Sequence, residues 1–103
     1  MFVGVLFYNN RTVYDGMWQE DNKCGFGREA FHNGDLYEGE FQNGKPHGKG
    51  IFKWINGELY DGQWSCGYKE GYGVWKNSQG DFYEGEWKAG KAHGKGLQKW
   101  GNG

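Results

Sequence analysis

The chain has 103 residues, enough for one small domain, and its 12 Lys and Arg nearly balance its 13 Asp and Glu. This balance argues against a basic nucleic-acid-binding domain, and neither a bilayer-spanning apolar run nor a signal segment is expected. Rings and glycine are unusually common, at 7 Phe, 7 Tyr, 6 Trp and 21 Gly. This composition predicts a folded chain whose core consists of rings.

One pattern of 23 residues repeats along the whole chain. Each unit begins with Tyr, has Gly two residues later and carries a ring at its fifth position. Further glycines recur at positions twelve, fourteen and twenty-one, the last of them Gly103. We therefore expect a single array: a partial repeat (1–13), three full repeats (14–36, 37–59 and 60–82) and a nearly complete one (83–103). Because the pattern starts and stops within a unit, we expect the chain to be part of a larger protein.

The expected elements are short strands. Residues 4–8 match the second half of a unit. In a full unit, residues 37–41 alternate with a period of two, which is typical of a strand with one packed face. A loop is expected over residues 42–49 and a second strand over 50–54. Asn56-Gly57 then predicts a type I′ turn into the next unit, as Asn33-Gly34 does one unit earlier.

These elements predict an all-β fold: an elongated, single-layer antiparallel sheet of successive β-hairpins, one hairpin per 23-residue repeat. Nine strands at a spacing of ~4.8 Å would span about 40 Å. The glycines at positions three and fourteen fall on the ring-bearing face. There they leave room for rings to lie over bare backbone, and ring pairs add stability beyond their buried area.

Residues 37–50 and 83–96 closely resemble the MORN (membrane occupation and recognition nexus) repeat; the second reads Tyr-Glu-Gly-Glu-Trp-Lys-Ala-Gly-Lys-Ala-His-Gly-Lys-Gly. The first unit departs from this pattern at Asp21 and Cys24. The resemblance implies a non-enzymatic scaffold module. Similar arrays join membranes to the cytoskeleton, self-associate, bind protein segments along a groove or bind phosphoinositides.

No catalytic residue, metal site or cofactor is predicted. Cys24 and Cys66 lie two repeats apart, too far for a disulfide, so free thiols and a cytoplasmic location are expected, at a membrane or the cytoskeleton. His47 and His93 are also two repeats apart and share no site. Once in every repeat a carboxylate falls on the face opposite the rings, and we interpret this ladder as a solvated surface. Its members are Asp15, Glu38, Asp61 and Glu84.

The rings are the first candidate site, because a single-layer sheet leaves an apolar strip without a covering layer. We expect them to form a groove that binds a protein segment or a second copy, although the same rings also hold the sheet together. Glu29, Asn77 and Gln98 interrupt the strip and could set the partner's register. The expected groove residues are Tyr14, Trp18, Tyr37, Phe41, Phe52, Trp54, Tyr60, Trp64, Trp75, Tyr83 and Trp87.

A row of loop cations is the alternative site. It would bind anionic phospholipid at about 1 kcal/mol per lysine and recruit the chain to a membrane, regulating an attached lipid kinase as in some similar arrays. The row also contains Glu70, and the chain carries no net positive charge. Its members are Lys45, His47, Lys49, Lys69, Lys91, His93 and Lys95.

Overall fold

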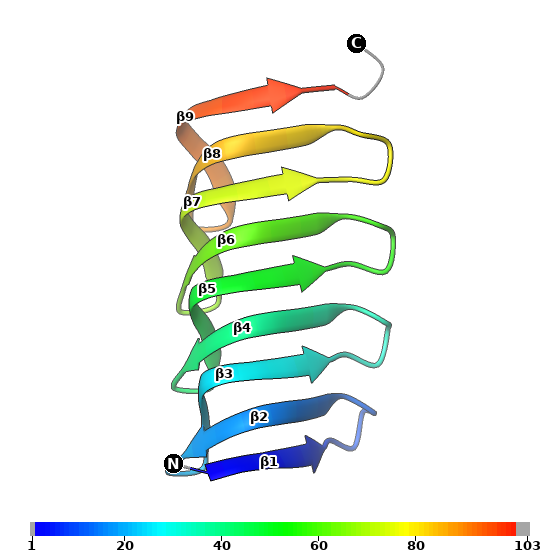
Figure 1. Cartoon of the computed structure of the whole chain (residues 1–103), viewed down its shortest axis with the longest axis vertical. Coiled ribbons are helices and arrows are strands. Elements are labelled where there is room, and N and C mark those ends of the chain that lie inside the picture. Colours follow the sequence, from blue (N-terminus) through cyan, green and yellow to red (C-terminus); the bar gives the residue numbers. More distant parts are fainter. Residues whose placement is uncertain (1, 101–103) are drawn as a thin grey trace.

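The computed structural model describes residues 2–100, and within this range it consists of one antiparallel sheet of nine strands and no helix. The strands stack in chain order along the long axis (Figure 1), which measures 46 Å. This confirms the all-β array of successive hairpins. The end of the last expected repeat, including Gly103, lies outside the described residues. The strands are β1 (Phe2–Phe7), β2 (Val13–Gln19), β3 (Asn22–Ala30), β4 (Leu36–Gln42), β5 (Lys45–Lys53), β6 (Leu59–Ser65), β7 (Tyr68–Lys76), β8 (Phe82–Lys88) and β9 (Lys91–Lys99).

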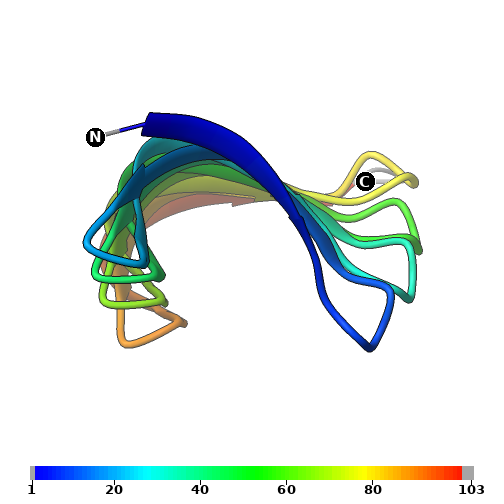
Figure 2. The same ribbon diagram turned by 90° about the horizontal axis from the view of Figure 1, so that it is seen from below.

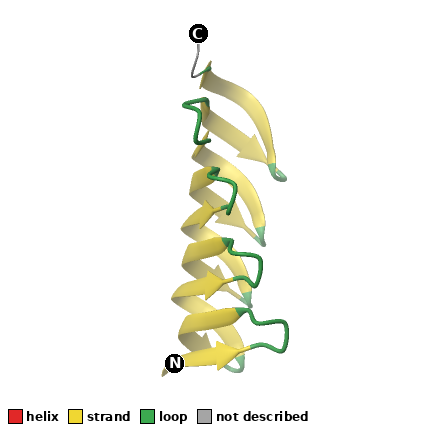
Figure 3. Ribbon diagram, turned by 90° about the vertical axis from the view of Figure 1, so that its right-hand side faces the viewer, coloured by secondary structure: helices red, strands yellow, loops and turns green. Residues whose placement is uncertain are grey.

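Each repeat forms a hairpin with a bulge at the same place. In β4–β5 the register shifts between Gly39 and Phe41, and the other three hairpins shift at the equivalent step. A bulge bends its strand, and four aligned bulges bend the sheet along one line. The sheet is therefore an arch when seen along its long axis (Figure 2). No second sheet or helix covers either face of the described strands (Figure 3).

The hairpin turns differ from the expectation. The predicted loop over 42–49 is wrong, because β5 already begins at Lys45. The tight turn is at Asn43-Gly44, where both residues have positive φ (51° and 82°), as a type I′ turn requires. The type I′ assignment at Asn56-Gly57 is also wrong. Only Gly57 has a positive φ there, because the connection from Trp54 to Glu58 is longer and is closed by the Gly57 N–H on the Trp54 carbonyl at 3.0 Å.

The same correction applies at Asn33-Gly34, where only Gly34 has a positive φ. In both connections the asparagine acts through its side chain. The Asn33 amide oxygen accepts the backbone N–H of Asp35, and that of Asn56 accepts the N–H of Glu58, each at 3.0 Å. Asparagine side chains commonly close turns in this way.

Six buried rings, here called the ring core, form the interior. Neighbouring rings meet edge to face, with centroids 4.9 to 5.4 Å apart, in one series from Trp18 at one end to Tyr83 at the other. Side chains converge on the inner side of an arch, so these rings occupy the inner face. The ring core consists of Tyr14, Tyr37, Phe41, Tyr60, Trp64 and Trp87.

The rings lie over bare backbone, as the glycine positions predict. A Cβ placed on Gly73 would lie 2.2 Å from the hydroxyl oxygen of Tyr60. The polar atoms of the rings are also paired: the Tyr60 hydroxyl donates to the Gln63 carbonyl at 2.9 Å, and the Trp64 indole donates to the Gly50 carbonyl at 3.1 Å. Buried phenols and indoles need such partners.

Candidate functional site

The eleven expected groove residues separate into two groups. Six of them make up the ring core, and their side chains are 0 to 9% exposed. The other five, listed at the end of this paragraph, are half-buried against that core on the same face. Among the eleven, this second group is the one that presents ring surface to solvent on the inner face. Its members are Trp18, Phe52, Trp54, Trp75 and Tyr83.

Four half-buried rings gather over the middle of the array, and we call them the aromatic strip: Phe31, Phe52, Trp54 and Trp75. Phe31 and Phe52 stack with centroids 5.8 Å apart, and Phe52 lies 4.5 Å from Trp54. The Trp75 indole donates to Glu58 at 2.9 Å. Phe31, which follows β3, was not among the expected groove residues.

The ends of the aromatic strip are polar. Glu29 stands in the first repeat where Phe52 and Trp75 stand in the next two, and it pairs with Lys23 at 3.0 Å. Asn77 closes its own turn by accepting the backbone N–H of Gln79 at 3.0 Å. Both side chains therefore have structural partners, whereas Gln98 on β9 is exposed.

Two lysines cover rings of the inner face. The Lys69 ammonium lies 4.9 Å from the centre of the Trp87 ring and 5.0 Å from that of Trp54, which are cation–π distances. Lys23 holds the same position over Tyr14 two repeats earlier, at 5.4 Å. Burial lowers the pKa of Lys69, and the nearby Glu58 carboxylate acts in the opposite direction.

Sequence reasoning placed Lys69 in the row of loop cations and passed over Lys23. Lys69 lies on the inner face, because the expected loop is in fact the start of β7 and the lysine side chain shares a face with the rings. The signal that could have found Lys23 was its position in the repeat, which is the same as that of Lys69. The second and fourth repeats have Pro46 and Ala92 there, so only alternate repeats carry this cation.

The other expected lipid-binding residues lie in strands rather than loops. Lys45 and Lys91 begin β5 and β9 directly after the tight turns and are exposed. Lys49 and Lys95 are exposed further along, and their backbone N–H groups donate to Glu40 and Glu86 at 2.8 and 2.9 Å. His47 accepts the backbone N–H of Cys66 at 3.3 Å, and His93 is exposed on β9. A carboxylate therefore lies beside the backbone of Lys49 and of Lys95.

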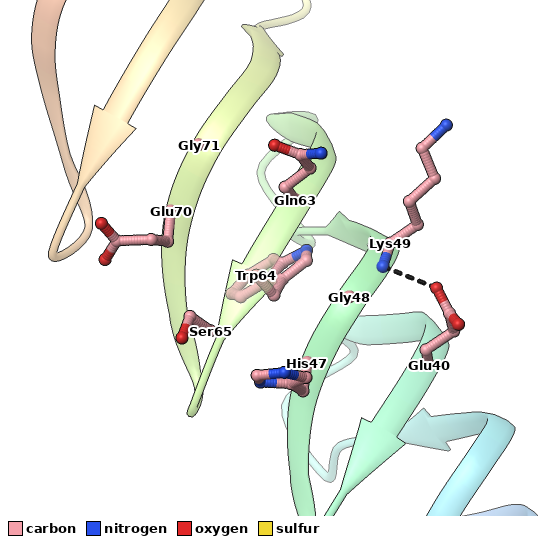
Figure 4. Close-up of a pocket in the computed structure, with 9 residues that line it drawn as sticks. All are labelled: Glu40, His47, Gly48, Lys49, Gln63, Trp64, Ser65, Glu70 and Gly71. Atoms are coloured by element: carbon pink, nitrogen blue, oxygen red, sulfur yellow. Dashed lines mark hydrogen bonds between the residues drawn. The ribbon is translucent and has the colours of Figure 1, made fainter.

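A shallow pocket lies beside Trp64, lined by residues of β4 to β7 (Figure 4). Its polar side chains include Glu40, His47, Gln63 and Glu70, and Glu70 accepts the backbone N–H of Ala89 at 3.3 Å. Within residues 2–100 no group of His, Cys, Asp or Glu is arranged to hold a metal ion. Cys24 and Cys66 are both free.

The expected carboxylate ladder faces away from the rings. Its members pair across strands with Arg28 or with aliphatic residues; Glu38, for example, lies 3.9 Å from Arg28 on one side and opposite Ile51 on the other. This face is open, and surface ion pairs of this length add little stability.

The model of the MORN repeat family matches four consecutive segments: residues 14–36, 37–58, 60–82 and 83–103. Comparison with curated proteins finds no match. The part of the chain that the structure describes contains no helix that could span a membrane.

Proposed function

The chain belongs to the MORN repeat family, and from that premise we propose that it is a non-enzymatic scaffold module whose aromatic strip binds a segment of a partner protein. Repeats of this family form interaction modules, and the family is non-catalytic. Free Cys24 and Cys66 fit the cytoplasmic location that we also propose.

The observation that carries this proposal is the half-buried state of the aromatic strip. One side of each ring already packs on the ring core, so the rings are held rigidly and binding a partner costs little further side-chain entropy. The other side of each ring has no covering layer among the described residues. Rigid, partly exposed aromatic side chains are the residues that contribute most at protein interfaces.

The strip also defines the chemistry of the partner. One repeat advances by two strands, or about 10 Å, so the rings of successive repeats offer contact points at that spacing. The strip is apolar at its middle and is flanked by Lys69 and by the Lys23–Glu29 pair. We therefore expect a segment with two apolar anchor residues about 10 Å apart.

The test begins with peptides selected from a displayed random library against the intact chain. Their affinity is measured by fluorescence anisotropy for the native sequence and for the Phe52→Ala and Trp75→Ala variants. Each variant is expected to weaken binding by about tenfold or more, because a rigid ring anchor is lost.

Tyr72→Ala is the matched control, since Tyr72 is a half-exposed ring (52%) on the opposite face. It should leave peptide affinity unchanged, and thermal melting checks that all three variants fold. Binding that survives both strip substitutions, or that falls only with Tyr72→Ala, would reject the aromatic strip as the binding site.

Membrane recruitment is the second candidate function. It is supported by Lys45, Lys49, Lys91 and Lys95, which are exposed at equivalent positions of the second and fourth repeats. Flotation with phosphoinositide-containing vesicles at low salt tests it, because each lysine near an anionic surface adds about 1 kcal/mol. Binding should then disappear in a Lys45→Glu, Lys91→Glu double variant, and flotation that does not depend on the anionic lipid would exclude this function.

A further inference from the structure

A pocket lies beside the aromatic strip, between the β1–β2 and β3–β4 connections. Its volume is about 300 Å³, at the lower end of the range for ligand sites, so it suits a single side chain of a partner. Phe31 and Phe52 of the aromatic strip provide its apolar lining, and Asp35 provides a carboxylate. The other lining residues are Asn10, Thr12, His32 and Asn33.

The half-buried Asp35 carboxylate has hydrogen-bond partners but no counter-ion. One of its oxygens accepts the backbone N–H of Ile55 at 2.9 Å, and the other accepts the side-chain amide of Asn33 at 3.1 Å. Both donors are neutral, and among residues 2–100 no lysine or arginine forms an ion pair with Asp35. Arg11, in the facing connection, is exposed and is not a lining residue. A negative charge beside two rings favours a cation as the ligand.

The equivalent place in the next repeat holds such a cation. The Lys69 ammonium lies 5.0 Å from the centre of the Trp54 ring, and it is near enough to the Glu58 carboxylate for the two charges to interact. The Trp75 indole also donates to Glu58, at 2.9 Å. The chain itself therefore supplies the positive charge and the N–H donor there. The counterparts, each 23 residues further along the chain, are Glu58 for Asp35, Trp54 for Phe31 and Trp75 for Phe52.

Both contributions are missing at the pocket. Phe52 has no N–H to donate, and Pro46 stands at the repeat position of Lys69. The short proline ring carries no charge and cannot extend across the rings as a lysine side chain does. The carboxylate and the rings of the pocket thus lack the cation that their counterparts have.

We propose, on the premise that the aromatic strip binds a segment of a partner protein, that this pocket receives an arginine of that segment. The guanidinium donates to the Asp35 carboxylate and packs on the rings of Phe31 and Phe52. It supplies what Lys69 and the Trp75 indole supply one repeat further along. Arginine suits the pocket better than lysine, because its planar group can donate to a carboxylate and stack on a ring at the same time.

The test uses the peptides selected against the intact chain, which should carry an arginine. Each is compared with a peptide that has citrulline in its place, a neutral residue of nearly the same shape. Affinities are measured for the native chain and for Asp35→Asn. Either change alone should weaken binding by about tenfold or more, because a charge-assisted hydrogen bond is lost. Asp35→Asn should not weaken the citrulline peptide further, since both changes remove the same charge pair.

Asp81→Asn is the matched control. Asp81 has the repeat position of Asp35 and also accepts an asparagine side-chain amide, at 3.0 Å, but Asn77 and Gln98 stand where the pocket has Phe31 and Phe52. This variant should leave both affinities unchanged, and thermal melting checks that each variant folds.

Pro46→Lys is a second variant, which takes the place of Asp35→Asn if that variant does not fold. It gives the pocket a cation of the chain's own and should weaken binding of the arginine peptide by about tenfold or more. Ala92→Lys, which adds a lysine at the same repeat position two repeats later, should not.

Two outcomes would overturn this inference and leave the proposed function standing. One is a set of peptides that depend on Phe52 and Trp75 but carry no arginine. The other is a loss on citrulline replacement that is equally large in the native chain and in Asp35→Asn. Peptides that bind independently of Phe52 and Trp75 would instead reject the proposed function, and this inference with it.

Discussion

At the scale of single residues, the unit that stabilises this protein is a tyrosine ring over two glycines. In the third repeat, Tyr60 covers Gly62 of its own strand and Gly73 of the partner strand, and its hydroxyl donates to the carbonyl three residues ahead. The ring is then closed in by Trp64 and Trp87, each about 5.2 Å away. Repeating this arrangement replaces the second layer that a sheet ordinarily needs to bury one face.

Gly73→Ala should destabilise the protein by about 1–3 kcal/mol, because the new methyl group would lie 2.2 Å from the Tyr60 hydroxyl oxygen and displace the ring. Gly4→Ala is the control, since Gly4 has the same repeat position but nothing closer than 3.7 Å. Urea unfolding of both variants measures the difference. Equal losses of stability would contradict the role assigned to the tyrosine.

The buried tyrosines also make stability depend on alkaline pH. Burial raises the pKa of Tyr60 from its usual value of 10.0 to about 12, and that of Tyr14 likewise to about 12, while the pKa of Tyr37 is also raised. Above pH 10 the unfolded chain loses these protons and the folded chain does not. The contribution of these tyrosines to stability should therefore be constant below pH 10 and fall as pH rises toward 12.

Urea midpoints measured across this pH range test the prediction, with Tyr60→Phe as the comparison. The variant loses one hydrogen bond, about 1 kcal/mol, at neutral pH. Its stability should then fall less steeply above pH 10, because one of the buried phenols is gone. A slope identical to that of the native chain would show that Tyr60 ionises equally easily in both states.

At the scale of one element, each hairpin combines a bulge with a tight two-residue turn. The turn also links successive repeats. The Gly67 N–H donates to the Pro46 carbonyl at 2.9 Å, and the Gly90 N–H donates to the Lys69 backbone carbonyl at 3.0 Å. The residue before that glycine, or before Asp21 in the first repeat, takes a positive φ in every repeat, and it is Glu20, Asn43, Cys66 or Ala89. Only asparagine tolerates this conformation well.

Ala89→Asn should therefore stabilise the last hairpin by about 0.5–1 kcal/mol, since Ala89 has a φ of 49° and asparagine is suited to a type I′ turn. Thermal unfolding would record this as a rise of a few degrees in Tm. Ala92→Asn controls for the chemical change, because Ala92 lies in a strand where φ is negative. A gain of the same size at both positions would refute the turn explanation.

The turns also show where sequence reasoning reached its limit. Asn-Gly is the strongest short hairpin signal, and it marks the tight turn at Asn43-Gly44, but the same dipeptide at Asn56-Gly57 lies in the longer connection between repeats, while a plain Ala89-Gly90 forms a tight turn. Dipeptide preference is weaker than the geometry that the paired strands impose. The strand period was predicted correctly, because alternation of ring and polar residues has one physical cause, the packing of one face.

At the scale of the whole molecule, the array is quasi-one-dimensional. Extensive contacts form only between strands that are consecutive in the chain. Stability then depends on each repeat and its neighbours, and it declines toward the ends, where a strand has one neighbour instead of two. The tyrosines of the repeats show this decline at the C-terminal side only, since Tyr14, Tyr37 and Tyr60 are 0 to 1% exposed while Tyr83 is half-buried.

Amide hydrogen exchange should therefore be slowest in β4 to β7 and fastest in β9, where all nine residues are exposed. Mass spectrometry of peptides from the exchanged chain resolves the strands separately. Uniform protection from β2 to β9 would show that the array unfolds as one cooperative unit.

The sequence by itself determined the periodic features of this protein: a 23-residue hairpin repeat, rings and glycines on one face, carboxylates on the other and membership of a repeat family. These follow from spacing alone, because strand residues alternate in direction and the repeat copies that alternation. Tertiary structure decided which rings are buried and which stay open. The Phe41 ring, for example, is buried because it packs edge to face on Tyr14 of the preceding repeat. Lys69 lies among the rings because strand pairing places it opposite Trp64. Contacts between repeats depend on the bulges and the arch, and these arise only when the strands pair.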